Sequence, residues 1–424
     1  MVPAEYGRPW FPRVVGALVA WVVAGLAPAC SRQDAASGGE RLFLGTGEYN
    51  AQNAWDAILR FDHSELLEGA AAAPNGTMPA KQLRAAGGPV LNFPHGLFYD
   101  DSSDELYVAS LFTQEGDDFS AAQACALDFK GTRCGSVGVV PAASQADGAV
   151  TLARHIAGDQ TQINKPHGVW VDRSRNVLYL ANTMSEDILV WDNASSRSGN
   201  VPPDRRIRHQ GMGAPVFVFV DEANDRGFVA IMGSQALDSG SGPRPAVVVF
   251  NDFSSRNGEV VPSVRIYGEN TRLGEGNNRT THNVWFDAAS SLLYVGHHTN
   301  EILVFDLSAV NLDPGEPVDL DLAPRVLRIN DQADLSDQYD WSTYGLFYLA
   351  KQDRLYVSAG NTVGGTASAS GPPNNPAAKH VVKVYEGVSR SSTSGVLTPA
   401  RRISWDNVNT YYPPQPLWVD SWGD

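Results

Sequence analysis

The sequence is poor in cysteine, in positive charge and in charged residues overall. Three cysteines among 424 residues exclude a disulfide-built scaffold and a cysteine-rich zinc fold. Lys and Arg number 32 against 47 Asp and Glu, and the formal charge of −15 argues against general binding of nucleic acid or of anionic lipid. Hydrophobic residues make up 43% of the chain, which is enough for a sizeable core and excludes global disorder.

Short motifs of common catalytic classes are also missing. The sequence contains no Gly-x-Ser-x-Gly, no His-Glu-x-x-His and no Cys-x-x-Cys. The glycine-rich segment 360–365 lies in a predicted loop rather than between a strand and a helix, so we do not expect a phosphate cradle. Function must therefore be argued from the fold and from residues that the fold brings together.

The first 29 residues have the features of a secretory signal peptide. Arg8 and Arg13 precede the apolar run 14–26, and small residues stand just before Cys30. The apolar run is shorter than the roughly 20 residues of a membrane-spanning helix. We therefore expect an exported protein, located at the bacterial outer membrane or in the periplasm as a lipoprotein, or secreted.

The placement of Cys30 resembles a bacterial lipoprotein signal, in which the cysteine is lipidated. Leu26 stands four residues before the cysteine where such signals prefer three, so plain cleavage after Ala29 is the alternative. The small and polar segment 30–40 has the composition of a tether. Because the chain is acidic, we expect contact with a membrane only through the lipid.

Two of the three cysteines stand close together in the sequence. Cys125 and Cys134 can form a disulfide in an oxidising compartment, which leaves Cys30 as the odd one. Three free thiols are the alternative.

One motif recurs along the chain and decides the fold. Three copies are 94–100 (PHGLFYD), 166–172 (PHGVWVD) and 281–287 (THNVWFD). A second aromatic follows seven residues after the end of each copy, at Tyr107, Tyr179 and Tyr294, and the same frame pairs Asp221 with Phe228 and Leu349 with Tyr356. Five copies of a two-strand unit are thus visible in the sequence.

The sixth copy is divided between the two ends of the chain. Residues 416–420 (PLWVD) match the first strand of the motif and have no second strand after them. Residues 41–46 (RLFLGT) match the second strand and have no first strand before them. The two ends therefore complete one another.

Alternating hydrophobicity in these segments predicts strands, and the motif Asp is expected to cap the first hairpin. Third strands such as 187–191 and 301–305 and fourth strands such as 205–208 give four antiparallel strands per repeat. Six repeats predict an all-β, six-bladed β-propeller, a single domain over 41–424 whose C-terminal strand joins the N-terminal blade and closes the ring. An aromatic stands two positions before the end of every copy, where we expect core between the blades: Phe98, Trp170, Phe219, Trp285, Phe347 and Trp418.

The segment 166–192 resembles the NHL repeat, with PHGVWVD followed by LYLAN and ILVWD. Over about residues 40–424 the pattern is similar to six-bladed propellers of the NHL and gluconolactonase-like group. The resemblance implies the fold. It selects no function, because such propellers include lactonases, a zinc-dependent amidating lyase and binding scaffolds.

One face of the predicted ring is constant in length and the other varies. The first hairpin always spans seven residues from motif end to aromatic, whereas the next connection ranges from 11 residues (Tyr294 to Phe305) to 29 (Tyr356 to Tyr385). Variable loops on a rigid scaffold carry binding residues disproportionately. We therefore expect the functional site at the channel mouth on this elaborated face.

Several polar side chains are expected at that mouth. The position five residues before the end of each copy lies nearest the axis, and its occupants are His95, His167, Val216, His282, Tyr344 and Gln415. Further residues expected there are His297, which ends the strand after His282, Asn182 at the equivalent position of its own blade, and Asn92 and Asn164, each three residues before a motif histidine.

Three neutral imidazoles that converge on the axis can bind a divalent metal, Zn²⁺ or Ca²⁺, and leave a position open for water. The resemblance adds that the amidating lyase holds its zinc by three histidines from different blades, which here match His95, His167 and His282, with His297 as a further candidate. No Asp or Glu occupies the six axial positions, which departs from a gluconolactonase-like site. The alternative is a polar ring that hydrogen-bonds backbone or water.

Two functions from different classes follow. The first is a non-catalytic, monomeric binding or scaffold module of the cell envelope, which holds a protein or glycan partner with its elaborated face. The second is a metal-dependent hydrolase or lyase that acts on a small extracellular substrate through the histidine triplet.

Overall fold

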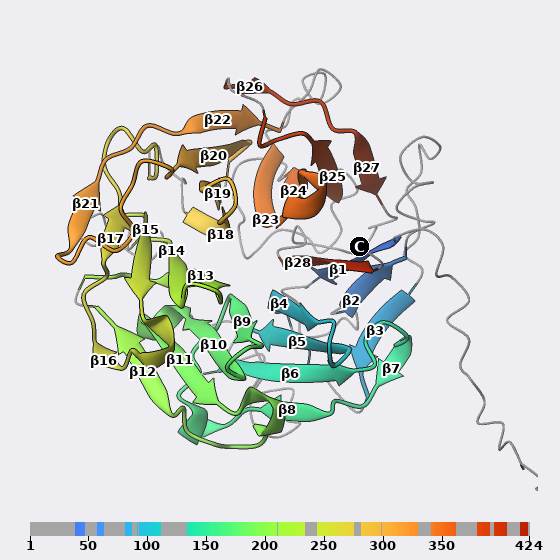
Figure 1. Ribbon diagram of the computed structural model, residues 1–424. Helices are drawn as coiled ribbons and strands as arrows, with labels where there is room; N and C mark the ends of the chain where they lie inside the picture. Colours follow the sequence, from blue (N-terminus) through green and yellow to red (C-terminus); the bar gives the residue numbers. More distant parts are fainter. Residues whose placement is uncertain are drawn as a thin grey trace, which may run out of the picture.

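Strands form almost all of the regular structure, and six sheets stand around a common axis (Figure 1). The computed structural model describes residues 39–46, 57–62, 81–86, 91, 93–111, 134–209, 211–233, 244–274, 281–297, 299–329, 341–361, 380–390, 394–404 and 416–422. The predicted all-β, six-bladed propeller is confirmed.

Each blade is a sheet whose strands follow the chain from the axis outward, apart from the first blade. Blade 1 contains β28 (Leu417–Trp422), β1 (Gly39–Thr46), β2 (Ala57–Phe61) and β3 (Lys81–Ala85). Blade 2 contains β4 (Pro94–Asp100), β5 (Glu105–Ser110), β6 (Ser136–Pro141) and β8 (Arg154–Ile156). Blade 3 contains β9 (Val169–Asp172), β10 (Val177–Asn182), β11 (Asp187–Asp192) and β12 (Arg205–Arg208).

The remaining blades repeat this arrangement. Blade 4 contains β13 (Pro215–Asp221), β14 (Arg226–Ile231), β15 (Ala246–Asn251) and β17 (Val264–Ile266). Blade 5 contains β18 (Thr281–Asp287), β19 (Leu292–His297), β20 (Glu301–Asp306) and β22 (Arg325–Arg328). Blade 6 contains β23 (Trp341–Leu349), β24 (Arg354–Asn361), β25 (His380–Glu386) and β27 (Arg401–Ser404). Short 3-10 turns lie at Asp159–Thr161, Thr183–Ser185, Ala194–Ser196, Phe253–Ser255 and Ala350–Gln352.

The predicted ring closure is confirmed. β28 pairs antiparallel with β1, from Leu417 opposite Leu44 to Trp422 opposite Gly39, so the two ends of the described chain share a blade (Figure 1). Because β1 begins at Gly39, the last two residues of the expected tether belong to this blade. Glu40 is buried there, and its carboxylate contacts side chains of blade 6.

Most blades carry a fifth strand that the sequence reasoning did not predict. A short segment from the outer connection of one blade pairs in parallel with the outermost strand of the preceding blade. These segments are β7 (Gly148–Val150), β16 (Gly258–Glu259), β21 (Val318–Leu320) and β26 (Gly395–Val396). The additional strand covers an edge that would otherwise expose unpaired backbone groups, and it ties neighbouring blades together.

The first hairpins are built by two polar positions. The motif Asp accepts a backbone N–H from the turn, as at Asp100 from Ser102 (3.0 Å) and at Asp172 from Arg175 (2.9 Å), so the expected capping role is confirmed. Four residues after the motif Asp, the chain has a positive φ, for example 49° at Asp225. In four blades the side chain at this second position accepts a backbone N–H from the loop after the third strand at 2.7–2.9 Å: Asp104 from Ser144, Asn176 from Ser195, Asp225 from Ser254 and Asp353 from Ser389.

Apolar residues of successive blades fill the space between the sheets. Aromatic rings stack across these interfaces, with centroids 4.6 Å apart for Tyr179 and Phe253 and 4.5 Å apart for Tyr294 and Tyr348. A third stack joins Phe228 and Phe286 at 4.5 Å. Such offset pairs add to the stability from buried area and fix the angle between blades.

The predicted signal peptide, most of the predicted tether and two of the three cysteines lie outside the described residues. Cys30 and Cys125 are not among them, and Cys134 is engaged in a disulfide, so the pairing of Cys134 with Cys125 stays a prediction. In the part of the chain that the structure describes, no helix is both long enough and apolar enough to span a bilayer.

Candidate functional site

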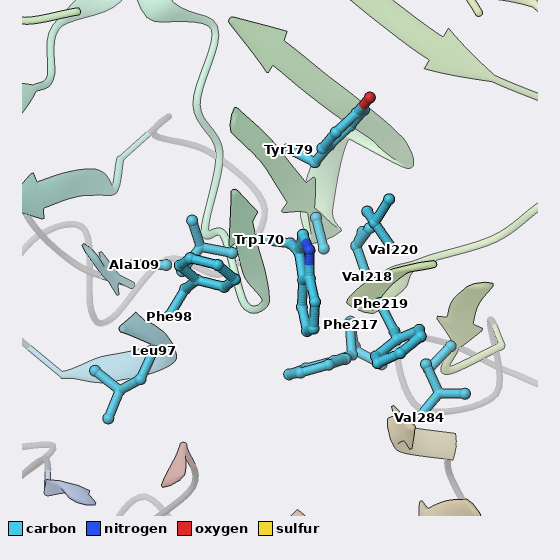
Figure 2. Close-up of a cluster of buried hydrophobic side chains, with 14 of the residues drawn as sticks. Leu97, Phe98, Ala109, Trp170, Tyr179, Phe217, Val218, Phe219, Val220 and Val284 are labelled. Atoms are coloured by element: carbon cyan, nitrogen blue, oxygen red, sulfur yellow. The ribbon is translucent and has the colours of Figure 1, made fainter. Parts of the chain in front are cut away.

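Six aromatic side chains fill the axis of the ring. They form a closed circle in which neighbouring ring centroids are 4.3–5.1 Å apart, in the order Phe98, Trp170, Phe219, Trp285, Phe347 and Trp418. Figure 2 shows three of these residues, Phe98, Trp170 and Phe219, side by side. The expected core position between the blades is confirmed, since each ring packs against rings of the neighbouring blades, and the six rings meet on the axis.

The three tryptophans also contact one another across the circle. Their centroids are 5.6 Å apart for Trp170 and Trp285, 5.5 Å for Trp170 and Trp418, and 5.8 Å for Trp285 and Trp418. Contacts across the circle leave no room for an open channel at this level. The axis therefore has two separate mouths, one at each end of the innermost strands.

The axial positions identified from the sequence coincide with a backbone irregularity. The pairing of the first two strands shifts register at residue 95 in blade 2, at 216 in blade 4, at 282 in blade 5 and at 344 in blade 6. A β-bulge redirects a side chain relative to the regular alternation of the strand. The bulge thus provides a repeated device for placing a side chain at the elaborated mouth.

Glycine follows the motif histidine because neighbouring inner strands approach closely there. A Cβ on Gly96 would lie 2.2 Å from the carbonyl oxygen of His167, and one on Gly168 would lie 2.8 Å from the Cα of Phe217. The amide of Gly168 donates to the carbonyl of Val216 at 2.9 Å across the blade boundary. The Pro-His-Gly motif therefore encodes close backbone contact between blades as well as the histidine itself.

The structure brings the three motif histidines together. The ring centroids of His95 and His167 are 4.4 Å apart and those of His167 and His282 are 6.1 Å apart, in edge-on arrangements. His95 and His282 are buried and His167 is half-buried. Phe93 packs on His95 with a centroid distance of 4.8 Å, so one side of the cluster is apolar.

Hydrogen bonds determine the protonated nitrogen of two of these rings. The hydroxyl of Thr183 donates its proton to the carbonyl of Pro215 at 2.8 Å, so its contact with Nδ1 of His167 at 2.7 Å requires Nδ1 to donate. In contrast, Nδ2 of Asn283 donates to the carbonyl of Tyr344 at 2.6 Å and to Nδ1 of His282 at 2.9 Å. In the neutral state, His167 therefore carries its proton on Nδ1 and His282 carries its proton on Nε2.

This arrangement fits a metal ion only in part. Two imidazoles on one tetrahedral zinc, with Zn–N bonds of about 2 Å, have centroids about 5 Å apart, which lies between the two separations observed. However, Nε2 of His282 presents an N–H rather than a lone pair while Asn283 holds Nδ1. Among the described residues no group of three or more His, Cys, Asp or Glu is arranged to hold a metal.

The other residues expected at the mouth differ in burial and in hydrogen bonding, and some lie outside the described residues. Asn182 is fully buried and organises its own blade: Oδ1 accepts the amide of Asn164 at 2.6 Å, and Nδ2 donates to Asp187 at 2.7 Å. Val216 is buried, and Tyr344 is half-buried with its carbonyl bound by Asn283. Gln415, Asn92 and the side chain of His297 lie outside the described residues.

The two faces of the ring differ in their connections as the sequence predicts. The first hairpin contains four residues in every blade from 2 to 6: 101–104, 173–176, 222–225, 288–291 and 350–353. We call this end of the ring the hairpin face. On the opposite loop face, the connection from the second to the third strand ranges from three residues (298–300) to 25 (111–135). The histidine cluster lies at the axis on the loop face, where the innermost strands begin.

Sequence reasoning missed a cavity at the other mouth. A cavity of about 460 Å³ opens on the hairpin face, and its lining residues come from the innermost strands of all six blades and from three first hairpins. The six axial aromatics line it, together with Tyr99, Asp101, Arg173, Val220, Asp221, Glu222, Leu349, Val419 and Asp420. The repeated aromatic position was visible in the sequence, but its exposure to a cavity was not.

Solved structures with a similar arrangement have low sequence identity to this chain. A chain of a nidogen/laminin complex is 12% identical over 90% of this chain and 98% of that one, with a TM-score of 0.47. A periplasmic gluconolactonase of Pseudomonas aeruginosa is 14% identical over 90% and 99%, with a TM-score of 0.47. A putative 6-phosphogluconolactonase of Bacteroides uniformis is 13% identical over 91% and 100%, with a TM-score of 0.42.

No family model and no curated protein matches the sequence. Structural likeness at this level assigns no activity to the chain, so its function has to be argued from its own residues.

Proposed function

We propose that this protein is an exported, monomeric binding propeller that holds a protein or glycan partner with its loop face. The observation that carries the proposal is the contrast between the two faces. Hairpins of four residues recur around one end of the ring, whereas connections at the other end range from three to 25 residues. A scaffold with a constant core and elaborated loops at one end is typical of recognition by loops.

The position of the chain entry supports this orientation. Gly39 pairs with Trp422, and Asp420, two residues earlier on the same strand, lines the cavity on the hairpin face. Cys30 precedes Gly39 by nine residues, which extend over at most about 30 Å. A lipid on Cys30 would hold the hairpin face toward the membrane, and the loop face would then point toward a partner.

Lysine-directed cross-linking in the native cell envelope tests this proposal with a control inside the chain. In the sequence, Lys130 belongs to the 111–135 connection and Lys379 to the 362–379 connection, whose flanking strands end at the loop face, whereas the exposed Lys351 lies in a first hairpin. We expect the partner to be cross-linked through Lys130 and Lys379 and not through Lys351. Cross-links that come mainly from Lys351 would contradict the proposal.

A loop-shortened variant provides the matching functional test. Replacing 362–379 by a four-residue Gly-Ser linker should abolish partner capture and leave thermal stability unchanged, because long surface connections contribute little to the core. The control is Lys351→Ala, which should leave capture intact. Retained capture after shortening both this connection and 112–133 would exclude the loop face as the binding face.

The histidine cluster supports a second candidate, a metal-dependent hydrolase or lyase that acts on a small extracellular substrate. Three imidazoles from three blades lie within contact distance at the axis. Binding of Zn²⁺ or Ca²⁺ through Nε2 of all three rings requires His282 to change its tautomer and Asn283 to release Nδ1. Metal binding would therefore be coupled to a local rearrangement.

Elemental analysis of the purified protein after exposure to excess zinc or calcium separates the two candidates. About one metal per chain that is lost in His167→Ala and kept in the control His209→Ala would support the metal site. Less than about 0.1 metal per chain would exclude it and leave the binding propeller.

A further inference from the structure

The cavity on the hairpin face is not used by either function proposed above. It is bounded below by the axial aromatics and at its sides by charged residues of the first hairpins and strand ends. From this lining we propose that the cavity binds a small organic cation of the quaternary ammonium class.

The aromatic floor provides the first argument. Six rings from six blades are gathered at one point, and three of them are tryptophans, whose faces attract cations most strongly among the aromatic side chains. Trp285 is only half-buried, while the other five rings are at most 9% exposed. Weakly hydrated alkylammonium ions suit such a surface, since they lose little solvation when they contact it.

The charge of the walls provides the second argument. Four carboxylates line the cavity, at Asp101, Asp221, Glu222 and Asp420, and one guanidinium, at Arg173. Arg173 pairs with Asp101 at 2.7 Å and with Glu222 at 3.7 Å, and Arg41, which is not a lining residue, pairs with Asp420 at 2.9 Å. The four carboxylates outnumber these two guanidinium groups by two, so the walls carry an excess of negative charge. The walls therefore favour a cationic ligand over a neutral or anionic one.

Two of these carboxylates are in an unfavourable environment when the cavity holds no cation. Burial raises the pKa of Asp420 to about 6, with the charges of Asp101 and Asp104 raising it further and Arg41 opposing. Burial also raises the pKa of Glu222, with a contribution from the charge of Asp172. A bound cation would offset both the cost of burying these charges and their repulsion, so its affinity should be linked to the ionisation of both groups.

The size of the cavity and the absence of a metal cluster narrow the class of cation. A volume of about 460 Å³ lies within the usual range for small-molecule sites and far exceeds the needs of a single metal ion. Over the described ranges no three acidic or histidine side chains converge as a metal site would need. An alkylammonium ion fits both the aromatic floor and the diffuse negative charge of the walls.

Calorimetric titration of the purified full chain, followed in parallel by tryptophan fluorescence, tests the proposal with matched probes. Choline is compared with 3,3-dimethylbutan-1-ol, which has the same shape and no charge. We expect choline to bind at least about tenfold more tightly than the alcohol at pH 7.5, and its affinity to fall as the pH is lowered through about 6, where Asp420 becomes protonated. Equal binding of the two probes, or no binding of choline at millimolar concentration, would refute the cation site.

Substitutions in the chain locate the site. Glu222→Gln and Asp101→Asn each remove one wall charge and should weaken choline binding by about fivefold, and Trp285→Phe should weaken it by a similar factor. Asp252→Asn is the control, because Asp252 is 78% exposed and does not line the cavity. Unchanged affinity in the first two variants, with their melting temperatures intact, would show that choline binds elsewhere and overturn the proposal.

A quaternary ammonium group can belong to a free solute or to a lipid headgroup. Sedimentation with phosphatidylcholine vesicles, compared with phosphatidylglycerol vesicles, separates these sources. Binding to choline and to phosphatidylcholine identifies a headgroup, binding to choline alone identifies a free solute, and both support the cation site. Preference for phosphatidylglycerol would contradict it, since that headgroup carries no cation. Because this mouth lies opposite the loop face, its failure would leave the binding propeller untouched.

Discussion

Closure of the ring depends on one buried carboxylate near the start of the described chain. Glu40 of β1 is 4% exposed, and its side chain contacts Arg354, Tyr356 and Arg401 of blade 6. Glu40→Gln keeps the shape and one acceptor but removes the charge. The two guanidinium groups, which are 19% and 10% exposed, then lose the charge of a shared partner.

The expected loss of stability follows from this burial. Removing one partner of a buried ion pair costs about 3–5 kcal/mol, and the retained amide oxygen places Glu40→Gln at the lower end, about 3 kcal/mol. The propeller runs from residue 39 to residue 422, a span of 384 residues (422 − 39 + 1), with an unfolding entropy of about 0.8 kcal/mol/K. The expected fall in melting temperature is therefore about 4 °C.

Scanning calorimetry of the variant measures this shift, with Glu316→Gln as the control. Glu316 is exposed on the connection between β20 and β22, so the same chemical change there should shift the melting temperature by less than about 1 °C. The double variant Glu40→Gln, Arg401→Met should lose less stability than the two single variants added together, because both substitutions remove the same ion pair. A shift for Glu40→Gln no larger than that of the control would show that this carboxylate does not hold blade 1 against blade 6.

Three further changes test how the blades are built. Gly96→Ala would push a Cβ into the backbone of the next blade and should cost about 3 kcal/mol in urea unfolding, whereas Gly395→Ala, with open space around it, should cost much less. Asp225→Ala removes both bonds to Ser254 and leaves alanine at positive φ, so about 2 kcal/mol should be lost. The pKa of the Asp420 carboxyl is raised from 3.8 to about 6, so the folded state binds the proton on this carboxyl more tightly than the unfolded state. The stability of the fold should therefore fall as the pH rises from about 3.8 to about 6. Asp420→Asn should flatten the slope of melting temperature against pH over this range.

The fold was predictable because each blade repeats a physical requirement that leaves a mark in the sequence. Asp100 and Asp172 cap the first hairpin, and that hairpin has one length, so the motif recurs in a fixed frame. The divided copy identified the closing pair of β28 and β1 for the same reason. The parallel fifth strands were not predictable, since segments such as β16 have two residues and no hydrophobic alternation.

The second polar position of the hairpin left a signal that the sequence reasoning did not use. An Asp, Asn or Ser stands four residues after the motif position in five blades, and its partner is a serine on a distant loop in four of them. The repeat frame makes this position visible. The serine that donates to this position is not visible in the same way, because the number of residues between the two positions varies from blade to blade.

The candidate site was predictable in position and less so in chemistry. The spacing from the motif end placed His95, His167 and His282 at one level, and the structure brings their rings together. Which ring nitrogen of His167 and of His282 carries the proton depends on Thr183 and Asn283. The hydrogen bonds of these two residues cross a blade boundary or follow a β-bulge. Such contacts are set by tertiary geometry and have no fixed sequence separation.

The aromatic circle explains why one strand can serve two sites. On β4, His95 stands three residues before Phe98, about 10 Å along the strand, and Asp101 follows three residues after it. The ring of Phe98 closes the axis together with its five neighbours, so a ligand at the histidines has no route to the acidic cavity. Substitutions at one mouth should consequently leave binding at the other unchanged, and coupling between choline and zinc or partner binding would require the aromatic circle itself to rearrange.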